Sequence, residues 1–418
     1  MTDDLDVDQL VRPEEVHSRV YTDPSIFQKE MELVFGRTWI FIGHESEVPN
    51  PGDFKTDRIG RWPILMTRDA GGKVHVFYNI CRHRGATLCH ESDGNGRSFK
   101  CMYHGWSFAS DGALIGVPLA ERMRGFDQAQ YGLVALARVE SYKGFVFASL
   151  CAEGMPLEVY LASVLPYLDE MVERAPNRRI AAVKPLKYEF DGNWKLQIEN
   201  FSENYHPSVL HQSVFAHRAR HTGKPTTTMK DSATGSREMA LAFGHAVVDF
   251  RGTRRGKPYP GEDEYLQALS RRDDPKRAAE LRDLDLHILI YPNLLLHTRF
   301  NHYRVVKPVA VDRTEIDVYP CRLGGAPDSL NEQLVHDSAD HVSPVGLVQV
   351  DDLQAFDWVQ DGLASGALGW MPLKLHGGDE HVNADGHLEW IGASEGVIRN
   401  QYQEWARLMS AGQPVAAH

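Results

Sequence analysis

The sequence has few cysteines and no long apolar run, and both absences limit what kind of protein it can be. Only five cysteines occur in 418 residues. This odd, sparse set argues against a disulfide framework and favours a reducing cytoplasm. No apolar stretch approaches the length of a membrane span. The acidic first ten residues match neither a secretory signal nor a transit peptide. We therefore expect a cytoplasmic protein without a membrane-embedded part.

An excess of positive charge is also absent. Lys and Arg number 45 against 57 Asp and Glu, which gives a formal net charge of −12. Because basic surfaces bind phosphate backbones, this balance disfavours a nucleic-acid partner. The sequence also lacks a G-x-G-x-x-G loop between a strand and a helix, so it shows no nucleotide-binding reductase of its own.

The chain is too long for one small core, and its pattern changes along the sequence. Asp23 and Pro24 predict the cap and the first residue of an N-terminal helix. Over residues 39–150, short β runs alternate with turn signals. Residues 69–72 predict a hairpin turn, and residues 145–148 predict the last buried strand. This part of the chain is expected to be a small all-β domain.

The remainder of the chain mixes helical and strand patterns. Residues 157–174 predict a helix, and residues 216–285, rich in charge, Gly and Thr, predict surface loops with short helices. Strand-like runs return over residues 288–308, and a mainly helical segment begins at Asp351. The sequence thus predicts an α+β fold with the β domain inserted near its start, divided into residues 1–38, 39–153 and 154–418.

The sharpest local pattern pairs two cysteines with two histidines. Cys81 and His83 are followed, after 17 intervening residues, by Cys101 and His104. Two thiolates and two imidazoles can hold a tetrahedral zinc, or a two-iron, two-sulfur cluster with thiolates on one iron and imidazoles on the other. The β hairpins around these residues, and Gly105 directly after the second histidine, favour the cluster. A structural zinc knuckle is the alternative.

A second pattern contains two histidines that a regular helix would separate. His206 and His211 are five residues apart and would not share a helical face. Pro207 disfavours a continuous helix at this point, so a break can let both imidazoles reach one metal. Two histidines and one carboxylate form the facial triad of non-haem Fe(II) oxygenases. The spacing alone is not specific, because chance pairs are expected among 20 histidines.

Together these motifs resemble those of a known family. The segments C-R-H-R-G at 81–85 and C-M-Y-H-G-W at 101–106 are similar to the Rieske motif of ring-hydroxylating oxygenases. The run E-N-x-x-E-x-Y-H-x4-H at 199–211 is similar to the catalytic signature of their large (alpha) subunits. The resemblance covers nearly the whole chain. It implies a Rieske domain inserted near the N-terminus of a helix-grip catalytic domain, an antiparallel sheet covered by helices.

The resemblance also implies the cofactors and their ligands. Cys81 and Cys101 would hold one iron of a Rieske [2Fe-2S] cluster, and His83 and His104 would hold the other. A mononuclear Fe(II) would be bound by the two histidines of the second motif and by an acid from a late helix.

The expected late helix supplies that third ligand. In the family, an acidic residue precedes a glutamine by eight positions. Counting back from Gln360 selects Asp352, and Asp351 is the alternative. Without the two histidines, this acidic pair would only indicate a helix N-terminus.

Three further residues receive roles from the resemblance. In the family, the position of Glu203 carries a carboxylate, more often Asp, that links a Rieske histidine of a neighbouring subunit to an iron ligand. Glu203 would therefore bridge His206 to His104 across a subunit boundary. Some relatives with Glu here act on quaternary ammonium compounds. Asn200 and Tyr205 are expected to line or support the iron site.

The substrate pocket is expected from residues near the second motif and from the strand that ends near residue 300. Leu294, Leu296 and Phe300 are candidate apolar liners. Arg299 or His297 is a candidate to hold a substrate carboxylate. An ordinary core role is an equally good interpretation of the three apolar residues.

The resemblance implies the terminal oxygenase of a multicomponent system. Electrons would come from NAD(P)H through a separate ferredoxin or flavin reductase, and O₂ would be added to an aromatic compound, with an aromatic carboxylate as a candidate. The product would be a cis-diol or a single hydroxyl. An α3β3 assembly with a small beta subunit is favoured over an α3 trimer. The alternatives are a monooxygenase or demethylase acting on a quaternary amine, and a Rieske electron carrier without a second iron.

Overall fold

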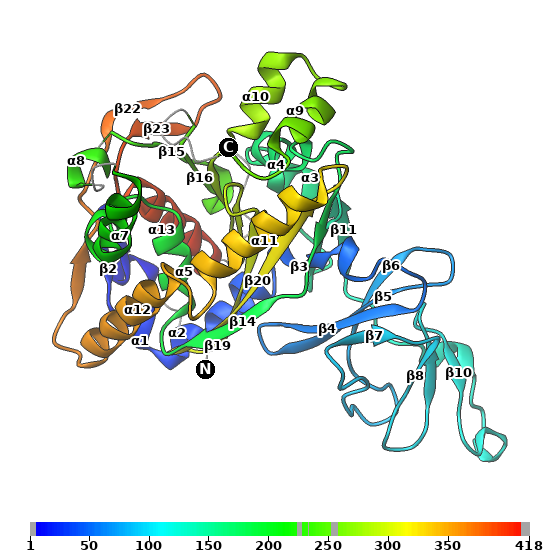
Figure 1. The fold of residues 1–418 in the computed structure, drawn as a ribbon. Helices are drawn as coiled ribbons and strands as arrows, with labels where there is room; N and C mark the ends of the chain where they lie inside the picture. The colour runs from blue at the N-terminus through cyan, green and yellow to red at the C-terminus, as the bar shows by residue number, and fades with distance from the viewer. Residues whose placement is uncertain (1–5, 224–227, 233, 252–257, 411–418) are drawn as a thin grey trace. The chain divides into compact units, whose positions relative to one another are not determined.

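The computed structural model of the protein describes residues 6–223, 228–232, 234–251 and 258–410. It contains two compact units, whose strands and helices Figure 1 labels. One comprises residues 35–157, which we call the β unit. The other comprises residues 1–34 and 158–418, which we call the larger unit. The β unit is therefore inserted into the larger unit near its N-terminus. The domain limits expected from the sequence, at residues 38 and 153, remain predictions.

Short antiparallel strands make up the β unit. β5 and β6 form the hairpin that the sequence predicts around residues 69–72, and Leu65 lies opposite Phe77 in it. The predicted last strand is β12, in which all residues are buried. The sheet orders are β6-β5-β4-β7, β10-β9-β8 and β11-β12-β3. The strands are β3 (Ile40–His44), β4 (Asp53–Ile59), β5 (Trp62–Arg68), β6 (Val74–Tyr78), β7 (Asp93–Asn95), β8 (Ser98–Lys100), β9 (Ser107–Ala109), β10 (Leu114–Gly116), β11 (Arg138–Tyr142) and β12 (Phe145–Ser149).

A ten-stranded sheet forms the centre of the larger unit. Its strand order is β13-β20-β19-β18-β17-β16-β15-β23-β22, with β14 paired to β20, and neighbouring strands are antiparallel. A small sheet, β1-β2-β21, joins two strands near the N-terminus to one strand from the C-terminal part of the chain. The strands are β1 (Val11–Arg12), β2 (Glu15–His17), β13 (Ile180–Ala182), β14 (Leu186–Phe190), β15 (Arg237–Ala240), β16 (Ala246–Asp249), β17 (Leu286–Ile290), β18 (Leu294–His297), β19 (His302–Ala310), β20 (Arg313–Leu323), β21 (Trp370–Pro372), β22 (Gly378–Val382) and β23 (Leu388–Ile391).

Helices pack on this sheet, with α11 against β20, α5 against β17 and β19, and α13 against β15 (Figure 1). Antiparallel strands covered by helices confirm the predicted α+β fold. Among the described residues, no helix is long and apolar enough to cross a membrane. The helices are α1 (Arg19–Thr22), α2 (Pro24–Glu30), α3 (Leu157–Leu161), α4 (Leu165–Glu173), α5 (Trp194–Phe201), α6 (Pro207–Leu210), α7 (Gln212–Thr222), α8 (Met229–Ser232), α9 (Glu262–Ser270), α10 (Pro275–Arg282), α11 (Asp328–Val342), α12 (Gln349–Ala364) and α13 (Gly396–Met409).

One buried carboxylate ties together three helices that are far apart in sequence. Glu30, at the end of α2, is fully buried and accepts a hydrogen bond from Lys195 Nζ at 2.6 Å. It also accepts hydrogen bonds from the indole N–H groups of Trp194, at 2.9 Å, and Trp405, at 2.7 Å. A buried charge is tolerated when it is paired and hydrogen-bonded in this way. The network fixes α5, whose C-terminal end leads into the second histidine motif.

Two expectations for the larger unit are wrong in detail. Residues 216–285 contain not only loops and helices but also β15 and β16, which lie within the ten-stranded sheet. Both strands have only four residues, so they are too short to show a clear alternation among charged neighbours. Residues 224–227, 233 and 252–257 lie outside the described residues. The helix expected over residues 157–174 is divided into α3 and α4, because Pro166 occupies the first turn of α4.

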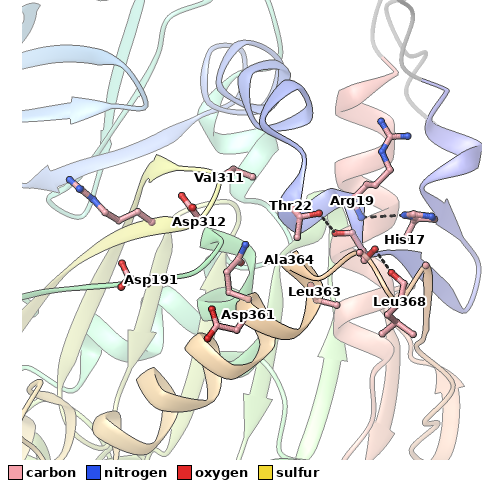
Figure 2. A pocket seen from close by; sticks show the side chains of 15 residues that line it. His17, Arg19, Thr22, Asp191, Val311, Asp312, Asp361, Leu363, Ala364 and Leu368 are labelled. Atoms are coloured by element: carbon pink, nitrogen blue, oxygen red, sulfur yellow. Dashed lines mark hydrogen bonds between the residues drawn. The ribbon is translucent and has the colours of Figure 1, made fainter.

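A wide hollow of about 830 Å³ opens where α1 meets the C-terminal part of α12 (Figure 2). Asp191, Asp312 and Asp361 are among its lining residues, and the figure shows their carboxylates at one side of it. The groups of three metal-binding side chains found among the described residues lie elsewhere. The hollow is therefore not the candidate site.

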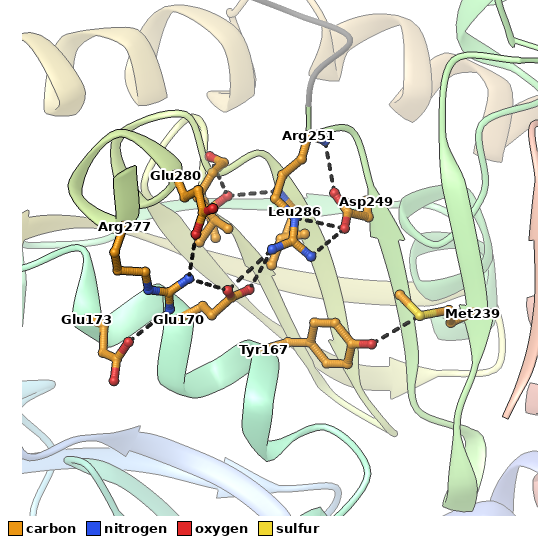
Figure 3. Close-up of polar contacts among 11 residues, drawn as sticks. Tyr167, Glu170, Glu173, Met239, Asp249, Arg251, Arg277, Glu280 and Leu286 are labelled. Carbon is orange, nitrogen blue, oxygen red and sulfur yellow. Dashed lines mark hydrogen bonds and ion pairs between the residues drawn. The ribbon is translucent and has the colours of Figure 1, made fainter. Parts of the chain in front are cut away.

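Ion pairs hold α10 against α4. Arg277, on α10, pairs with Glu170 and Glu173 of α4 at 3.0 Å each (Figure 3). Arg251 pairs with Glu170 at 3.1 Å and with Asp249, at the end of β16, at 2.6 Å. Glu170 thus joins both arginines, and the network links α4, α10 and β16.

Candidate metal centres

The two cysteine and histidine motifs form two loops with the same backbone turn. In each loop a glycine N–H donates to the carbonyl of the preceding cysteine, at 3.0 Å from Gly85 to Cys81 and at 2.9 Å from Gly105 to Cys101. The φ angles of the two glycines are +72° and +77°, a region that glycine adopts without steric cost. Each turn therefore presents one cysteine and one histidine from a short, rigid loop.

The side chains of these loops divide into a thiol pair and an imidazole pair. Cys81 and Cys101 are each 2% exposed. Burial raises the pKa of the Cys81 thiol, and the neighbouring Cys101 thiol adds to this effect. The rings of His83 and His104 have centroids 4.5 Å apart, and the His83 ring stacks on Trp106 at 4.8 Å. The Nδ1 atom of His83 is buried without a hydrogen-bond partner. This orphaned nitrogen and the paired donors fit a cluster with thiolates on one iron and imidazoles on the other.

The second histidine motif brings three metal-binding side chains together. The Nε2 atoms of His206 and His211 lie 3.6 Å and 3.2 Å from Oδ1 of Asp352, and the ligand atoms of all three lie within 4.8 Å of one another. α5 ends at Phe201, and a new short helix, α6, begins at Pro207. The break therefore comes earlier than Pro207 alone predicts. His206 and His211 flank α6 at its two ends, and both reach the first turn of α12.

A carboxylate lies beside the outer nitrogen of each imidazole. Nδ1 of His206 is in contact with Glu203, and Nδ1 of His211 lies 3.2 Å from Oδ2 of Asp351. These contacts hold both rings with Nε2 toward Asp352, as outer partners of metal-binding histidines do. Glu203 is not on a helix with His206. It reaches the ring from a tight turn, in which its carboxylate also accepts from the backbone N–H groups of Tyr205 and His206.

The charge of Asp352 suits a metal ligand. Burial favours the neutral acid, but a hydrogen bond with His211 and the nearby charges of His206 and Arg304 hold the pKa of Asp352 below its ordinary value. Asn200 donates from Nδ2 to Oδ1 of Asp352 at 3.1 Å, and the same nitrogen lies 3.2 Å from Nε2 of His206. Asn200 is therefore within reach of a metal bound here.

A cavity of about 120 Å³ opens beside these three side chains. Its apolar lining includes Phe201, Phe215, Phe250 and Phe300. Tyr205 is not among the lining residues, and its side chain is 46% exposed. The structure thus places Asn200 at the candidate site but does not bring Tyr205 into it.

The polar lining differs from what the sequence suggested. His297 lines the cavity as expected, but Arg299 does not, because it pairs with Asp285 at 3.2 Å. Leu294 and Leu296 are fully buried core residues of β18. The cationic lining residues are Arg218 and Arg304, neither of which sequence reasoning selected. Arg304 lies between Tyr303 and Val305 in β19, and a cation between two large apolar side chains was the available signal.

A second group of potential metal ligands lies at the same cavity. Ligand atoms of Asp285, His287 and His297 are also within 4.8 Å of one another. However, Arg299 already pairs with Asp285, and the N–H of Phe300 donates to Nδ1 of His297 at 3.3 Å. Burial, followed by neighbouring histidines and arginines, lowers the pKa of His297 well below its ordinary value. The surroundings are therefore cationic and disfavour a second metal ion.

Comparison with known families agrees with this geometry. Residues 38–142 match the Rieske [2Fe-2S] domain, and residues 178–411 match the catalytic domain of the ring-hydroxylating alpha subunit. The chain belongs to the ring-hydroxylating alpha subunit family. It is therefore an oxidoreductase of the Rieske oxygenase class, as the motifs predicted.

Similar proteins extend over nearly the whole chain. Toluate 1,2-dioxygenase subunit alpha of Pseudomonas putida is 31% identical over 96% of this chain and 94% of that protein. Anthranilate 1,2-dioxygenase large subunit of Acinetobacter baylyi is 32% identical over 94% of this chain and 89% of that protein. The crystal structure of naphthalene 1,2-dioxygenase from Rhodococcus sp. bound to indole has a TM-score of 0.83 and 26% identity, covering 96% of this chain and 95% of that chain.

This membership confirms the cofactors expected from the motifs. The ring-hydroxylating alpha subunit carries a Rieske [2Fe-2S] cluster and a mononuclear iron, and the alternative of a zinc knuckle is wrong. The presence of the catalytic domain also argues against a protein that only carries electrons. The two sets of ligand side chains fit these cofactors. At the cluster site the buried Nδ1 of His83 has no hydrogen-bond partner, and at the iron site the lowered pKa of Asp352 favours the carboxylate.

Proposed function

We propose that the chain is the terminal oxygenase component of a multicomponent system that hydroxylates a single-ring aromatic compound. The observation that carries this proposal is the cavity of about 120 Å³ beside His206, His211 and Asp352, with phenylalanine rings in its lining. A buried apolar cavity of roughly 150 Å³ in another protein accepts benzene. The volume therefore suits one aromatic ring better than a fused ring system.

The proposed ligands follow the geometry. His206, His211 and Asp352 would hold the mononuclear Fe(II), and Glu203 and Asp351 would orient the two imidazoles through Nδ1. When bound, the iron supplies a site at which O₂ meets the substrate and the delivered electrons. The role of the chain is then to place the ring beside that site and to keep bulk water out with apolar side chains.

The proposed cluster ligands are Cys81, His83, Cys101 and His104. Their loops would deliver single electrons, and Glu203 would connect His206 to His104 of the neighbouring subunit. This connection requires several copies of the chain, so we expect a trimer, with α3β3 favoured over α3.

Electrons would come from NAD(P)H through a separate ferredoxin or flavin reductase, since the sequence carries no nucleotide-binding loop of its own. A cis-diol requires the ring, O₂, two electrons and two protons, and both oxygen atoms stay in the product. A single hydroxylation uses the same inputs but releases one oxygen atom as water. The sparse free cysteines suggest that the system works in the cytoplasm.

A quaternary amine is the second candidate substrate, raised by the Glu at position 203. The charge of the cavity argues against it. A cationic substrate would lie near Arg218, Arg304 and the bound metal, and it would lack a free carboxylate partner among the described lining residues, since Glu203 and Asp352 serve the two histidines. Like charges without compensation disfavour binding.

A single-turnover experiment tests the proposed function without the unidentified reductase. The holoprotein is reduced chemically, freed of reductant, and mixed with ¹⁸O₂ and benzoate, toluene or choline in parallel. We expect a ring-hydroxylated product containing ¹⁸O from an aromatic compound, and no product from the His206→Ala variant. Oxidation of choline alone, or of none of the three, would contradict the proposal.

A further inference from the structure

Arg304, on β19, is a buried cation whose protein partners are all neutral. It is 6% exposed and lines the cavity. Its Nε donates to Nε2 of His302 at 3.2 Å, and its Nη1 donates to Oε1 of Gln349 at 2.7 Å. The hydroxyl of Tyr188 is a third contact. Among the described residues, no carboxylate forms an ion pair with this guanidinium. Such burial of an arginine is unusual, because buried arginines are normally paired with an acid.

The neutral partners hold the guanidinium in one orientation. His302 and Gln349 are fully buried. Burial, and then the positive charge of Arg304, lower the pKa of His302 well below its ordinary value, so this imidazole is neutral and can accept. The guanidinium also lies over the ring of Phe201, at 5.4 Å from the ring centroid. The hydrogen bonds to His302 and Gln349 use two of the five N–H donors of the arginine, which leaves donors for a ligand.

The charge balance of the cavity indicates the sign of that ligand. The charged groups in its described lining are Arg218, Arg304, Glu203 and Asp352. The two arginines offset the two carboxylates, so a bound Fe(II) leaves the cavity with an excess of positive charge. Asp352 lines the same cavity as Arg304, but its carboxylate is directed to His206 and His211. An anion in the cavity would supply the counter-charge that Arg304 lacks.

We propose that Arg304 binds the carboxylate of an anionic, single-ring aromatic substrate and so determines which ring compounds enter the site. This inference rests on the proposed function, because it concerns the same cavity. An arginine binds a carboxylate through two parallel N–H donors, which fixes the orientation of the ring as well as its affinity. Arg304 and Asp352 line the same cavity, so a carboxylate held by Arg304 would keep the ring in the cavity that adjoins the proposed metal ligands. His302 and Gln349 are positioning residues that hold the guanidinium.

The test compares a charged ligand with a neutral one of the same shape. Dissociation constants of benzoate and benzamide are measured by calorimetry on the anaerobic holoenzyme, for the wild type and for Arg304→Gln and Arg304→Lys. Arg218→Gln is the matched control, because Arg218 also lines the cavity but is exposed and contacts His341 at 3.3 Å. Iron and cluster content are measured on every variant.

We expect the wild type to bind benzoate more tightly than benzamide. Loss of one partner of a buried charge pair typically weakens binding by about 30-fold or more. Arg304→Gln should therefore lose roughly that factor for benzoate and no more than about threefold for benzamide, and Arg304→Lys should retain part of the preference. Arg218→Gln should change the preference little.

Three results would overturn the proposal. The first is an equal loss of affinity for both ligands in Arg304→Gln, and the second is a loss of iron in that variant, because each would mean that Arg304 only supports the site. The third is a wild type that shows no preference for benzoate. Ring hydroxylation of toluene with no benzoate preference would refute the role of Arg304 but leave the proposed function standing. If benzoate binds through Arg304 but neither benzoate nor toluene is hydroxylated, the role of Arg304 would stand and the proposed function would be refuted.

Discussion

Replacing Glu203 by Gln should weaken the mononuclear iron site without affecting the cluster. The Glu203 side chain is 10% exposed, and its carboxylate contacts Nδ1 of His206 and the backbone N–H groups of Tyr205 and His206. Glutamine keeps one neutral acceptor oxygen but removes the negative charge that holds the imidazole. The ring would then lose the charge-assisted contact that turns Nε2 toward the metal.

The size of this effect follows from the contacts. A hydrogen bond to a charged group contributes about 1.5–3 kcal/mol, and about 1.4 kcal/mol corresponds to a tenfold change in affinity. The loss should therefore weaken Fe(II) binding roughly 10- to 100-fold, the range found for outer partners of other metal-binding histidines. Glu203→Asp should weaken binding less, because it keeps the charge but shortens the side chain.

Competition between the protein and a chromophoric Fe(II) chelator, under anaerobic conditions, measures this affinity. Glu158→Gln is a suitable control, because Glu158 is exposed on α3. The rate at which the reduced cluster is reoxidised by O₂ in the presence of substrate is a second measurement, because Glu203 is also proposed to link two subunits. That rate should fall even in variant protein that is fully loaded with iron.

An unchanged Fe(II) affinity in Glu203→Gln would show that this carboxylate does not orient His206. An unchanged reoxidation rate in iron-loaded protein would refute only its role between subunits. If the Glu203→Gln variant also loses the cluster, the substitution disturbs more than the iron site.

Asp352→Asn should abolish stable iron binding, whereas Asp351→Asn should weaken it only about 3- to 10-fold, and iron content after dialysis against a chelator separates the two. Lys195→Met should destabilise the protein by about 3–5 kcal/mol in urea unfolding, because it leaves Glu30 charged and buried, and adding Glu30→Gln should recover part of that loss. Burial raises the pKa of Glu199 to about 7, from 4.5. Ionisation of Glu199 therefore lowers the free energy of unfolding, by roughly 3 kcal/mol at most, as the pH rises from about 4.5 to about 7. Glu199→Gln should therefore reduce the fall in melting temperature between pH 5 and pH 8, and an unchanged fall would contradict this.

Ligands that lie close together in the sequence were the most predictable part of the site. Cys81 and His83 share one loop, and His206 and His211 flank one short helix, so the spacing alone limits where their side chains can go. Asp352 was different, because no local rule connects it to histidines about 140 residues away. Only the resemblance to the family selected it.

Spacing could not separate the roles of the two adjacent acids. Asp351 and Asp352 both lie in the first turn of α12, and either could face the histidines. In the structure, Asp352 reaches both Nε2 atoms, and Asp351 reaches Nδ1 of His211. The difference depends on how α12 is rotated against α6, which is decided by tertiary packing and not by local sequence.

The substrate cavity was the least predictable part. Arg299 was a candidate to bind a substrate carboxylate, but it pairs with Asp285, which lies 14 residues earlier, directly before β17. No local pattern in the sequence indicates that pairing. Arg304 lies in a strand whose first seven residues are all buried, so the alternation of exposed and buried positions gives no sign of which face it occupies. The short strands β15 and β16 were missed for a similar reason, since three of the four residues in β15 and all four in β16 are buried, and such short runs carry little periodic signal.

Metal and sulfide analysis of the purified protein, with an EPR spectrum after reduction, tests whether the chain holds both a Rieske cluster and a mononuclear iron. We expect about two cluster irons and one mononuclear iron per chain, with acid-labile sulfide and the signal of a Rieske cluster. In His206→Ala only the mononuclear iron should be lost, and the cluster signal should be unchanged. A full set of irons in that variant, or a fully loaded wild type with no iron beyond the cluster, would contradict the assignment of the catalytic site.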